Sequence, residues 1–514
     1  MFPQGHIRKQ PAQPLSWYPI KTQQRTCAAV PVFFYGDAGC CFTMTNNRAQ
    51  AQQLHLDSLN NYDSVQLSLT CLSGVDRHLV VTRDRLKDLL VKKDAVNFGS
   101  DIPQNSLIFD SVSSCGAATV DISSLRPLPW LSTDGRRVGG AMCHIAPPTL
   151  KGSSLPCVSA RSAALQQIAR LREEFGLEIK SAFEMEFMIY EKFDDQRDGT
   201  VPFNDSTLCN YGRIDSWAGR EHCFFDTCQS LVRAGLPIES LMTEMAAGQF
   251  EITFKPQIGV ASPDSVILAK EGLRKCLGIS GLTPTFMASP SSEGHFNGFH
   301  LNHSLWRAAT GRFEGTNDGQ AFGSSPVDGD VVKGDALNAF LDSDDPLLLS
   351  ATARHWLAGL IQHGPGLALI SSPTLNCARR LQDPLTPKRT NWAVENRSAF
   401  LRIRNAKDNV YVENRLPSSA SNPYLVLASV LAAGMDGLRR QLECPPPGDT
   451  HAQPIPTTLE EAVSCLQGDS LLTDALGEDL VSAILSHTRK SLGGKNCQHL
   501  EDLDRQRQIY FRYI

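Results

Sequence analysis

The clearest pattern in this chain is a set of short segments in which apolar residues alternate with acidic, amide or histidine side chains. Four segments show it: Ala182–Phe187, Gly248–Phe254, Gly298–Ser304 and Tyr411–Leu416. Because successive side chains of a β-strand point to opposite faces, each segment should bury its apolar residues and present its polar ones together. A sheet with an apolar face on a core and carboxylates on the other face can line a metal-filled cavity.

Much of the sequence between and after these segments has the apolar spacing of helices. Apolar spacing, capping residues and prolines predict helices over residues 162–175, 220–234, 263–277, 346–361, 422–438 and 458–492. Residues 64–128 instead alternate short apolar runs with turns and hold one helix near residues 83–91. The predicted fold class is therefore α+β, and the one-sided polarity of the strands favours an antiparallel sheet packed by helices.

These patterns divide the chain into three predicted parts. Residues 1–60 are polar and unpatterned and are expected to form a divergent flexible extension. Residues 61–150 should form a small β domain, with strands over 65–69, 78–81 and 106–109. Residues 151–514 should form a large domain that carries the four alternating segments. Its loop over residues 381–392, which contains two prolines, could act as a lid.

Composition excludes several functional classes. The balance of 49 basic and 54 acidic residues does not indicate a binder of nucleic acid or of a membrane surface. The longest apolar runs are too short to span a bilayer, and the N-terminus lacks the apolar stretch of a signal peptide. The 15 cysteines include no CxxC pair, which indicates free thiols. We therefore expect a cytoplasmic protein.

Carboxylates provide the main candidate chemistry. Five glutamates and one histidine form a candidate set of metal ligands: Glu184, Glu186, Glu244, Glu251, His300 and Glu413. Hard divalent cations take several carboxylate oxygens, and a mixed oxygen and imidazole set suits Mg²⁺ or Mn²⁺. A single Glu-x-Glu pair on a strand is more often a solvated face, but recurrence of the pattern in several strands favours a site.

Four arginines form a second candidate set, because the guanidinium group suits carboxylate and phosphate ligands. They are Arg380, Arg397, Arg402 and Arg415. Two of them, Arg397 and Arg415, lie in strand-like contexts, where a purely solvated role is less expected. The chain contains no Gly-rich phosphate loop, serine triad or HExxH motif.

Several motifs, taken in order along the chain, resemble the class I glutamine synthetases. They are Phe183–Phe187, Glu244–Ile252, Pro284–Met287, Asn396–Ala399 and Asn422–Leu425. The resemblance runs from about residue 64 to the C-terminus. It implies a small N-terminal β-grasp domain and a large catalytic-type domain with a curved antiparallel sheet. The implied reaction is ATP-dependent: glutamate becomes γ-glutamyl phosphate, and ammonia then displaces the phosphate.

The resemblance divides the candidate metal ligands into two groups and adds one catalytic residue. One cation would be held by Glu186, Glu244 and Glu251, and a second, bridging the nucleotide phosphates, by Glu184, His300 and Glu413. Asp110 matches an aspartate that binds ammonium across a subunit boundary. The implied assembly is a homo-oligomer, typically a dodecamer of two hexameric rings.

The arginines also receive roles from the resemblance. Arg380, Arg397 and Arg415 would contact the glutamate substrate and the phosphoryl group, so Arg397 joins Asp110 as a catalytic candidate. Arg402 and Ser304 would lie near ATP.

The chain also departs from the family pattern at several of its site positions. Phe296 stands where a glycine normally allows close backbone approach, and Asn302 stands where a second histidine is expected, with His303 on the opposite face. Thr386 lies nearest to the position of a lid glutamate that deprotonates ammonium, and Tyr411 replaces an arginine. Loss of a general base costs about 10²–10⁴ in rate, and loss of an electrostatic donor about 10²–10³.

Three functional hypotheses follow. The first is a catalytically inactive scaffold with a structural or chaperone-like role, similar to an inert vertebrate lens member of the family that is associated with intermediate-filament proteins. The alternative is an active ATP-dependent ligase that joins glutamate to ammonia or to another amine. The third is a regulator that binds nucleotide or amino acid without turnover and changes its assembly size.

Overall fold

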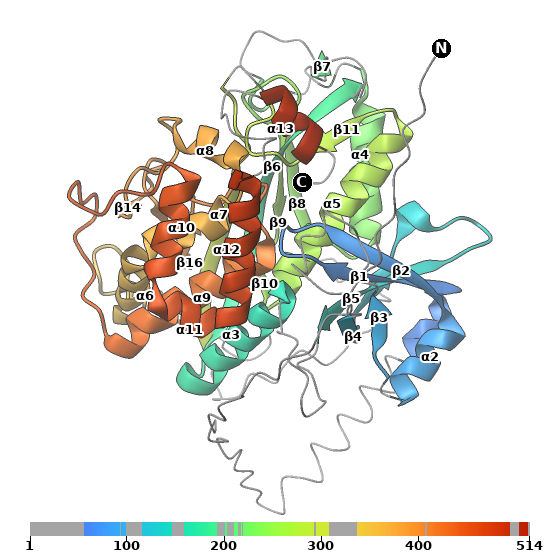
Figure 1. The fold of residues 1–514 in the computed structure, drawn as a ribbon, viewed down its shortest axis with the longest axis horizontal. Coiled ribbons are helices and arrows are strands. Elements are labelled where there is room, and N and C mark those ends of the chain that lie inside the picture. The colour runs from blue at the N-terminus through green and yellow to red at the C-terminus, as the bar shows by residue number, and fades with distance from the viewer. Residues whose placement is uncertain are drawn as a thin grey trace, which may run out of the picture. The chain divides into compact units, whose positions relative to one another are not determined.

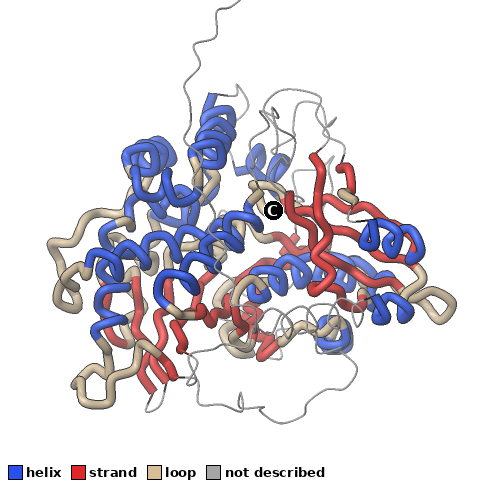
Figure 2. Tube along the Cα trace, turned by 90° about the horizontal axis from the view of Figure 1, so that it is seen from below, coloured by secondary structure: helices blue, strands red, loops and turns tan. Residues whose placement is uncertain are grey.

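The structure, a computed structural model, describes residues 56–92, 94–98, 116–145, 159–192, 201–202, 210–213, 217, 219–291, 294–307, 337–406, 409–493 and 503–511. The predicted strand over 106–109, Asp110 and the predicted extension before residue 56 lie outside the described residues. Within the described residues, the strands gather into two sheets, and helices pack beside both groups of strands (Figures 1 and 2).

The first sheet has five strands in the order β2-β1-β5-β4-β3. Their bounds are β1 Ser64–Thr70, β2 Asp76–Thr82, β3 Val96–Phe98, β4 Gly116–Pro127 and β5 Val138–Ile145. Neighbouring strands are antiparallel, except that β1 and β5 are parallel. Helix α2 (Arg83–Lys92) buries Leu86 and Leu89 in the same apolar cluster as β1, so the helix and the first two strands predicted for this region are confirmed.

The second sheet carries the four alternating segments. Its strands follow the order β14-β15-β16-β12-β6-β9-β8, and four short strands pair with β6 or β12. The bounds are β6 Glu178–Lys192, β7 Val201–Pro202, β8 Ile238–Thr243, β9 Gln249–Phe254, β10 Gln257–Ile258, β11 Thr283–Thr285, β12 Phe299–Arg307, β13 Leu337–Asn338, β14 Trp392–Val394, β15 Leu401–Ala406 and β16 Asn409–Asn414. All pairs are antiparallel except β14 with β15.

The alternation within these strands places their side chains as predicted. On β6, Phe183, Met185 and Phe187 are fully buried, whereas Glu184 and Glu186 keep partial exposure on the other face. The imidazole of His303 on β12 faces the core, where its Nε2 accepts a hydrogen bond from Trp356 Nε1 at 3.0 Å. The predicted α+β fold with a mainly antiparallel sheet is therefore confirmed.

Helices account for most of the remaining described residues. Their bounds are α3 Ala160–Phe175, α4 Glu221–Arg233, α5 Ala261–Ile279, α6 Ala351–Gln362, α7 Gly364–Ser371, α8 Leu375–Leu381, α9 Pro423–Arg440, α10 Leu459–Gly468, α11 Ser470–Leu476, α12 Glu478–Gly493 and α13 Leu503–Tyr510. Figure 1 shows α4 and α5 side by side. The helices predicted over residues 162–175, 220–234, 263–277 and 422–438 are confirmed.

Two helix predictions were wrong, one at its start and one because the predicted helix is interrupted. The helix predicted to begin at Pro346 begins at Ala351, because the Ser350 side chain caps it by accepting a hydrogen bond from the Ala353 amide. Gly364 does not end a helix but opens α7. The single helix predicted over 458–492 is three helices, because the side chain of Asp469 caps the start of α11 and Gly477, at φ 96°, ends it.

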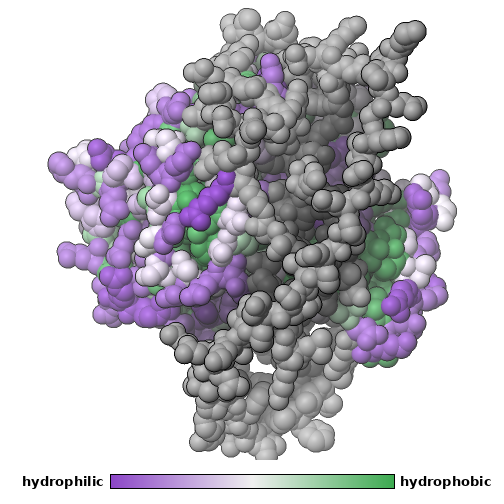
Figure 3. Space-filling view, viewed as in Figure 1, coloured by the Kyte–Doolittle hydropathy of each residue, from purple (hydrophilic) through white to green (hydrophobic). Residues whose placement is uncertain are grey.

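One face of the helical part carries mainly polar side chains. Figure 3 shows mainly hydrophilic side chains around α6 and α10 on the face in view. No helix among the described residues combines the length and the apolar character needed to cross a membrane.

A buried histidine between α6 and α7 contacts aspartates of α9 and of the N-cap of α11. His363, between α6 and α7, contacts Asp469 Oδ2 through Nδ1 at 2.8 Å and Asp436 Oδ2 through Nε2 at 3.1 Å. Arg440 also donates to Asp436, at 2.9 Å. Burial by itself would lower the pKa of His363, but the hydrogen bonds and charges of the two aspartates outweigh it and raise that pKa. The two aspartates thus favour the protonated imidazole, which in that form donates to one carboxylate on α9 and to another at the N-cap of α11.

This contact predicts a pH dependence of stability. Because the pKa of His363 is higher in the folded than in the unfolded chain, its contribution is complete below about pH 6.5 and is lost as pH rises through the folded pKa. In His363→Gln this contribution should be absent. Thermal unfolding midpoints of the two proteins, measured across this pH range, should differ most at the acidic end. A constant difference at every pH would contradict the prediction.

Candidate functional site

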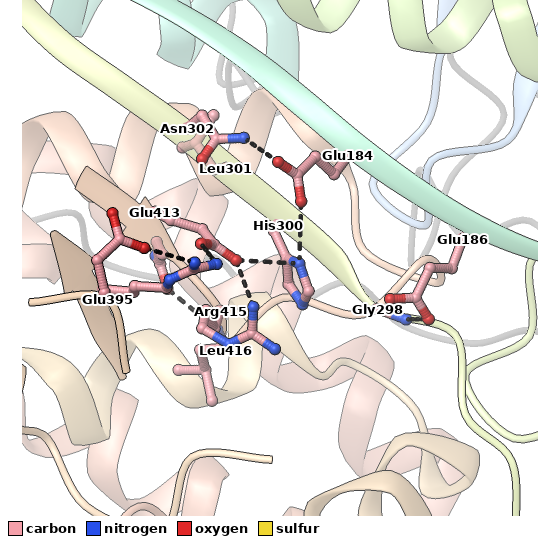
Figure 4. Close-up of polar contacts among 12 residues, drawn as sticks. Glu184, Glu186, Gly298, His300, Leu301, Asn302, Glu395, Glu413, Arg415 and Leu416 are labelled. Atoms are coloured by element: carbon pink, nitrogen blue, oxygen red, sulfur yellow. Dashed lines mark hydrogen bonds and ion pairs between the residues drawn. The ribbon is translucent and has the colours of Figure 1, made fainter. Parts of the chain in front are cut away.

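Three neighbouring strands bring a glutamate, a histidine and a second glutamate together on one sheet face. His300 on β12 lies directly opposite Glu184 on β6. On the other side of β12, Glu413 on β16 lies opposite Asn302. His300 Nδ1 lies 3.5 Å from Glu184 Oε2 and 3.4 Å from Glu413 Oε1 (Figure 4). Within the described residues, these three side chains form a group whose ligand atoms all lie within 4.8 Å of one another. They form a candidate cation site.

The other three predicted ligands lie beside this group. Glu186 and Glu251 are directly opposite each other on β6 and β9, and Glu244 lies on the turn before β9. Burial, together with the charges of Glu184 and Glu186, raises the pKa of Glu251 to about 9. Burial and the charge of Glu186 likewise raise the pKa of Glu244 to about 7. These carboxyl groups repel one another when ionised, which is the condition that a divalent cation relieves.

Glu184 has the opposite electrostatic environment. Burial opposes ionisation, but hydrogen bonds from His300 and Asn302 lower the pKa of Glu184 to about 2. The amide of Asn302 donates to Glu184 Oε1 at 2.7 Å, so the residue that replaces the expected second histidine orients a carboxylate instead. The ionised Glu184 is therefore available as a cation ligand over the whole neutral pH range.

Unsatisfied polar atoms gather at the same place. Among the described residues, Asn302 Oδ1, Arg402 Nε and Arg415 Nε are buried atoms that have no hydrogen-bond partner. Buried polar groups of folded proteins are normally paired, and a bound ligand is one way to pair them. A carbonyl oxygen suits a cation, and guanidinium N–H groups suit an anion. These residues therefore fit a divalent cation accompanied by an anionic group such as a nucleotide phosphate.

The structure places two of the predicted arginines on Glu413. Arg402 Nη1 donates to Glu413 Oε2 at 2.9 Å, and Arg415 Nη1 donates to Glu413 Oε1 (Figure 4). Glu413 is almost fully buried, at 2 % exposure, and it also faces His300. Its charge is therefore shared between a histidine and two guanidinium groups.

The remaining predicted residues have different surroundings. Arg380 is buried, and its guanidinium donates to the carbonyl oxygens of Leu416 at 2.8 Å and Arg415 at 3.1 Å, which holds the end of β16. Arg397 lies exposed on a turn, and its charge partly offsets the raised pKa of Glu244. Ser304 is buried and accepts a hydrogen bond from Trp306 Nε1 at 2.9 Å. Asp110 lies outside the described residues.

Three residues that the sequence did not single out organise the Glu186 side of the site. Gln249 Nε2 donates to Glu186 Oε2 at 3.2 Å and to the carbonyl of Phe296 at 2.8 Å. The amide of Gly298 donates to Glu186 Oε2 at 2.8 Å, and Ser419 Oγ donates to the Gly298 carbonyl at 2.8 Å. Gln249 shares its strand face with Glu251, so the alternation of β9 was the signal available for it.

Gly298 gives a direct test of the site. A Cβ atom at this position would lie 2.8 Å from Glu186 Oε1 and 2.9 Å from His300 Nε2. Gly298→Ala should therefore displace both side chains and weaken Mn²⁺ binding by roughly 10- to 100-fold, as for other perturbations of ligand orientation. Titration calorimetry measures the affinity. Gly468→Ala, where a Cβ atom meets nothing within 4 Å, is the matched control, and equal affinities would refute the placement of these ligands.

Comparison with protein families identifies the class to which this fold and site belong. The family model described as the glutamine synthetase catalytic domain matches residues 158–328 and 330–499. The chain therefore belongs to the glutamine synthetase family. Members of this family normally use ATP and a divalent metal and are typically oligomeric.

Similar proteins include both lengsins and glutamine synthetases. A lengsin from Canis lupus familiaris is 27% identical over 407 residues, which covers 77% of this chain but 62% of that protein. A glutamine synthetase from Thermotoga maritima is 26% identical over 454 residues, which covers 84% of this chain and 92% of the enzyme. The matched region thus spans less than two thirds of this lengsin, and the two identities are nearly equal.

Solved structures share the fold. A structure described as apo GmaS without ligand has a TM-score of 0.71 and 25% identity, and the match covers 87% of this chain and 97% of that one. A structure described as a novel glutamine synthase homolog has a TM-score of 0.70 at 22% identity, with 88% and 99% covered. The second similarity concerns the fold alone.

Proposed function

We propose that this chain is a glutamine synthetase homologue that retains a cation and nucleotide site but has lost ligase turnover, and that it acts as a structural or chaperone-like component. The observation that carries the proposal is the state of the loop after Arg380. In the implied reaction, a lid carboxylate on this loop would deprotonate ammonium. Without a base, the ammonium ion has no free electron pair with which to attack an acyl phosphate.

Thr386 occupies the position nearest to that carboxylate. It is buried at 6 % exposure, and its hydroxyl lies 2.7 Å from the Asp383 carbonyl and 3.1 Å from the Arg380 carbonyl. Lys388 Nζ donates to the Leu381 carbonyl at the start of the loop. A hydroxyl group that is held on backbone carbonyls cannot act as a base at neutral pH, so this position contributes no proton acceptor.

The acidic side chain of the same loop has its own partner. Asp383 Oδ1 accepts a hydrogen bond from the Leu385 amide at 2.7 Å, which fixes the turn between them. The loop is also joined to a distant segment, because the Thr390 amide donates to the Gln453 carbonyl at 2.9 Å. These hydrogen bonds hold the loop in one conformation. They therefore argue against the lid predicted for residues 381–392.

ADP release tests the proposal. Purified protein would be incubated with ATP, glutamate, ammonium and Mg²⁺ or Mn²⁺, with Glu413→Ala as the background. We expect a rate equal to that background, together with measurable cation binding that Glu413→Ala weakens. A rate clearly above background that depends on both glutamate and ammonium would refute the loss of turnover.

A second candidate function is an active ligase for glutamate and a different amine. It is favoured by the complete carboxylate set around Glu251, whose raised pKa shows that the set is costly to ionise without a cation. This candidate predicts ADP release with at least one member of a panel of primary amines, even when ammonium gives none. Absence of release across the panel would exclude it for those amines.

The assembly and partners remain part of the proposal. Membership of a family whose members are typically oligomeric supports a homo-oligomer. A dodecamer of two hexameric rings is the specific expectation. The cytoplasmic location and the lens and intermediate-filament associations stay predictions. Light scattering tests the assembly. One unchanged size with and without ATP and glutamate would favour the structural role over a ligand-sensing regulator.

A further inference from the structure

Two arginines on β15 present guanidinium groups at the edge of the cation site. Arg402 and Arg404 are two positions apart on one strand, so they share a sheet face. Arg402 pairs across the sheet with Glu413, and Arg404 pairs with Tyr411, the residue that replaces an expected arginine. The Arg404 guanidinium lies 6.0 Å from the centre of the Tyr411 ring. One positive charge, that of Arg402, therefore contacts Glu413 of the cation group, and the charge of Arg404 lies two positions further along the same strand face.

One carboxylate of the same chain contacts both guanidinium groups. Glu395 Oε2 lies 2.7 Å from Arg402 Nη2, and Glu395 Oε1 lies 3.1 Å from Arg404 Nε. Figure 4 shows Glu395 reaching toward the guanidinium group that also contacts Glu413. Each oxygen of Glu395 thus takes a different arginine, in the way that two oxygens of a phosphate group would.

The backbone of Glu395 is in an unusual conformation. Its φ is 52°, in the left-handed region that bulky non-glycine residues rarely adopt. Its amide donates to the Ile403 carbonyl at 3.0 Å, which fixes this geometry beside β15. The side chain remains 48 % exposed, so it can leave the arginines without unfolding the strand. A strained residue that holds a removable contact at a functional site is typical of a switch position.

Arg402 retains capacity for a further ligand. Its side chain is 9 % exposed, and its Nε is a buried donor with no partner among the described residues. Nη1 contacts Glu413 and Nη2 contacts Glu395. An anion that entered beside Arg402 would therefore find one unused donor and a second donor that Glu395 occupies.

We infer that Glu395 is an internal competitor for an anion subsite formed by Arg402 and Arg404, and that the ligand which displaces it is a polyphosphate group. A polyphosphate carries several oxygens of high charge and can bridge a cation in the adjacent carboxylate group and the two guanidinium groups at once. The single carboxylate of Glu395, by contrast, contacts only the guanidinium groups of Arg402 and Arg404. This inference rests on the proposed retention of a nucleotide site, and it requires no catalytic turnover.

Binding measured by calorimetry tests the inference. The probes are inorganic tripolyphosphate and ATP, each with Mg²⁺ at constant ionic strength. Removal of two partly exposed ion pairs in Glu395→Gln should strengthen binding of both probes by about 2- to 30-fold. Arg404→Met should weaken binding, and Glu395→Gln should have a smaller effect in the Arg404→Met background than alone.

Glu174→Gln is the matched control. Glu174 also accepts two hydrogen bonds from a guanidinium group, that of Arg439, at an exposed position between α3 and α9. It should leave the affinity unchanged. Glu395→Asn is a second test variant, because asparagine tolerates a left-handed backbone better than most residues. Circular dichroism verifies that each variant is folded.

The outcomes separate this inference from the proposed loss of turnover. Equal or weaker binding in Glu395→Gln would overturn the competitor role, whatever the ADP release assay shows. Stronger binding of ATP but not of tripolyphosphate would also overturn it, because the nucleoside and not the phosphates would then be the recognised group. Citrate provides a tricarboxylate arm, and a gain for citrate equal to that for tripolyphosphate would overturn the assignment to phosphate chemistry.

Discussion

Gly437→Ala should destabilise the protein by about 3 kcal/mol or more, because α6 and α9 cross in direct backbone contact at this residue. A Cβ atom at position 437 would lie 2.0 Å from the His355 carbonyl oxygen and 2.8 Å from the Gly359 amide nitrogen. These are backbone atoms of the facing helix, so no side-chain rotation relieves the overlap. The helices would have to separate, which would open the packed core around Trp356.

Two further glycines allow α6 and α9 to approach each other closely. Gly359 on α6 would place a Cβ atom 2.2 Å from the Ala433 carbonyl oxygen, and Gly434 on α9 would place one 2.4 Å from the Trp356 ring. A Gly359→Ala variant should therefore fail in the same way as Gly437→Ala. The two substitutions together should cost less than the sum of their separate effects, because the first already separates the helices.

Urea unfolding measures the effect, and an exposed helical glycine provides the control. At Gly278 on α5, a Cβ atom would meet nothing within 4 Å. Gly278→Ala should change the free energy of unfolding by no more than about 1 kcal/mol, because the residue lies in the last turn of α5, where helix propensity counts for less than in a helix interior. A Gly437→Ala midpoint that matches the wild type would show that α6 and α9 do not pack in the way described.

The strand pattern carried most of the information about the site. In Ala182–Phe187 the alternation is local, because each side chain's face follows from its own position in the strand. The pairing of His300 with Glu184 follows only once the register of β12 on β6 is known. The sequence thus predicted which residues share a face, and the resemblance to a family predicted which of these residues share a cation. The order of the strands came from the structure.

Element ends were harder to predict, because they depend on competing local signals. Pro346 looked like the first residue of a helix, but Asp345 Oδ1 accepts hydrogen bonds from the amides of Leu347 and Leu349 and forms a turn instead. Leu348 within this turn has a φ of 59°, which no helix permits. The cap at Ser350 then starts α6 one turn later than predicted.

The roles of the arginines depend on contacts that no sequence pattern contains. Arg380 was expected on a substrate, yet its guanidinium donates to carbonyl oxygens 35 and 36 positions away in the chain. Glu395 was not a candidate at all, although it contacts two arginines of the site. Both side chains are long and flexible, so the partner that each selects is fixed by tertiary packing and not by its own sequence neighbours.

Divalent cation should reverse the pH dependence of stability that the carboxylate group imposes. The pKa of Glu251 is raised from 4.5 to about 9, so the folded chain holds this proton more tightly than the unfolded chain does. Without cation, the stabilising effect of that proton is complete below about pH 4.5 and is lost as pH rises toward 9. Thermal midpoints without cation should therefore fall between neutral and mildly alkaline pH, and Glu251→Gln should lessen the fall.

Cation binding must displace this proton, which makes the affinity itself depend on pH. For each proton released, the affinity for Mg²⁺ should rise about tenfold per pH unit below the pKa of the group concerned. At about pH 8, where Glu244 with a pKa of about 7 is already ionised, Glu251 should release close to one proton per cation. Calorimetry in two buffers with different enthalpies of ionisation counts that proton.

The Glu251→Gln variant distinguishes binding of a cation at the site from a general effect of salt on stability. Glu251→Gln should abolish proton release at about pH 8 while Glu184, His300 and Glu413 still bind Mg²⁺, though more weakly. Glu239→Gln, on the exposed part of β8, should leave both proton release and affinity unchanged. Proton release that persists in Glu251→Gln would mean that another group gives up the proton. An absence of Mg²⁺ binding in the wild type and in every variant would mean that Glu251 limits the repulsion among the carboxylates by keeping its proton, and the metal site would then be a structural remnant.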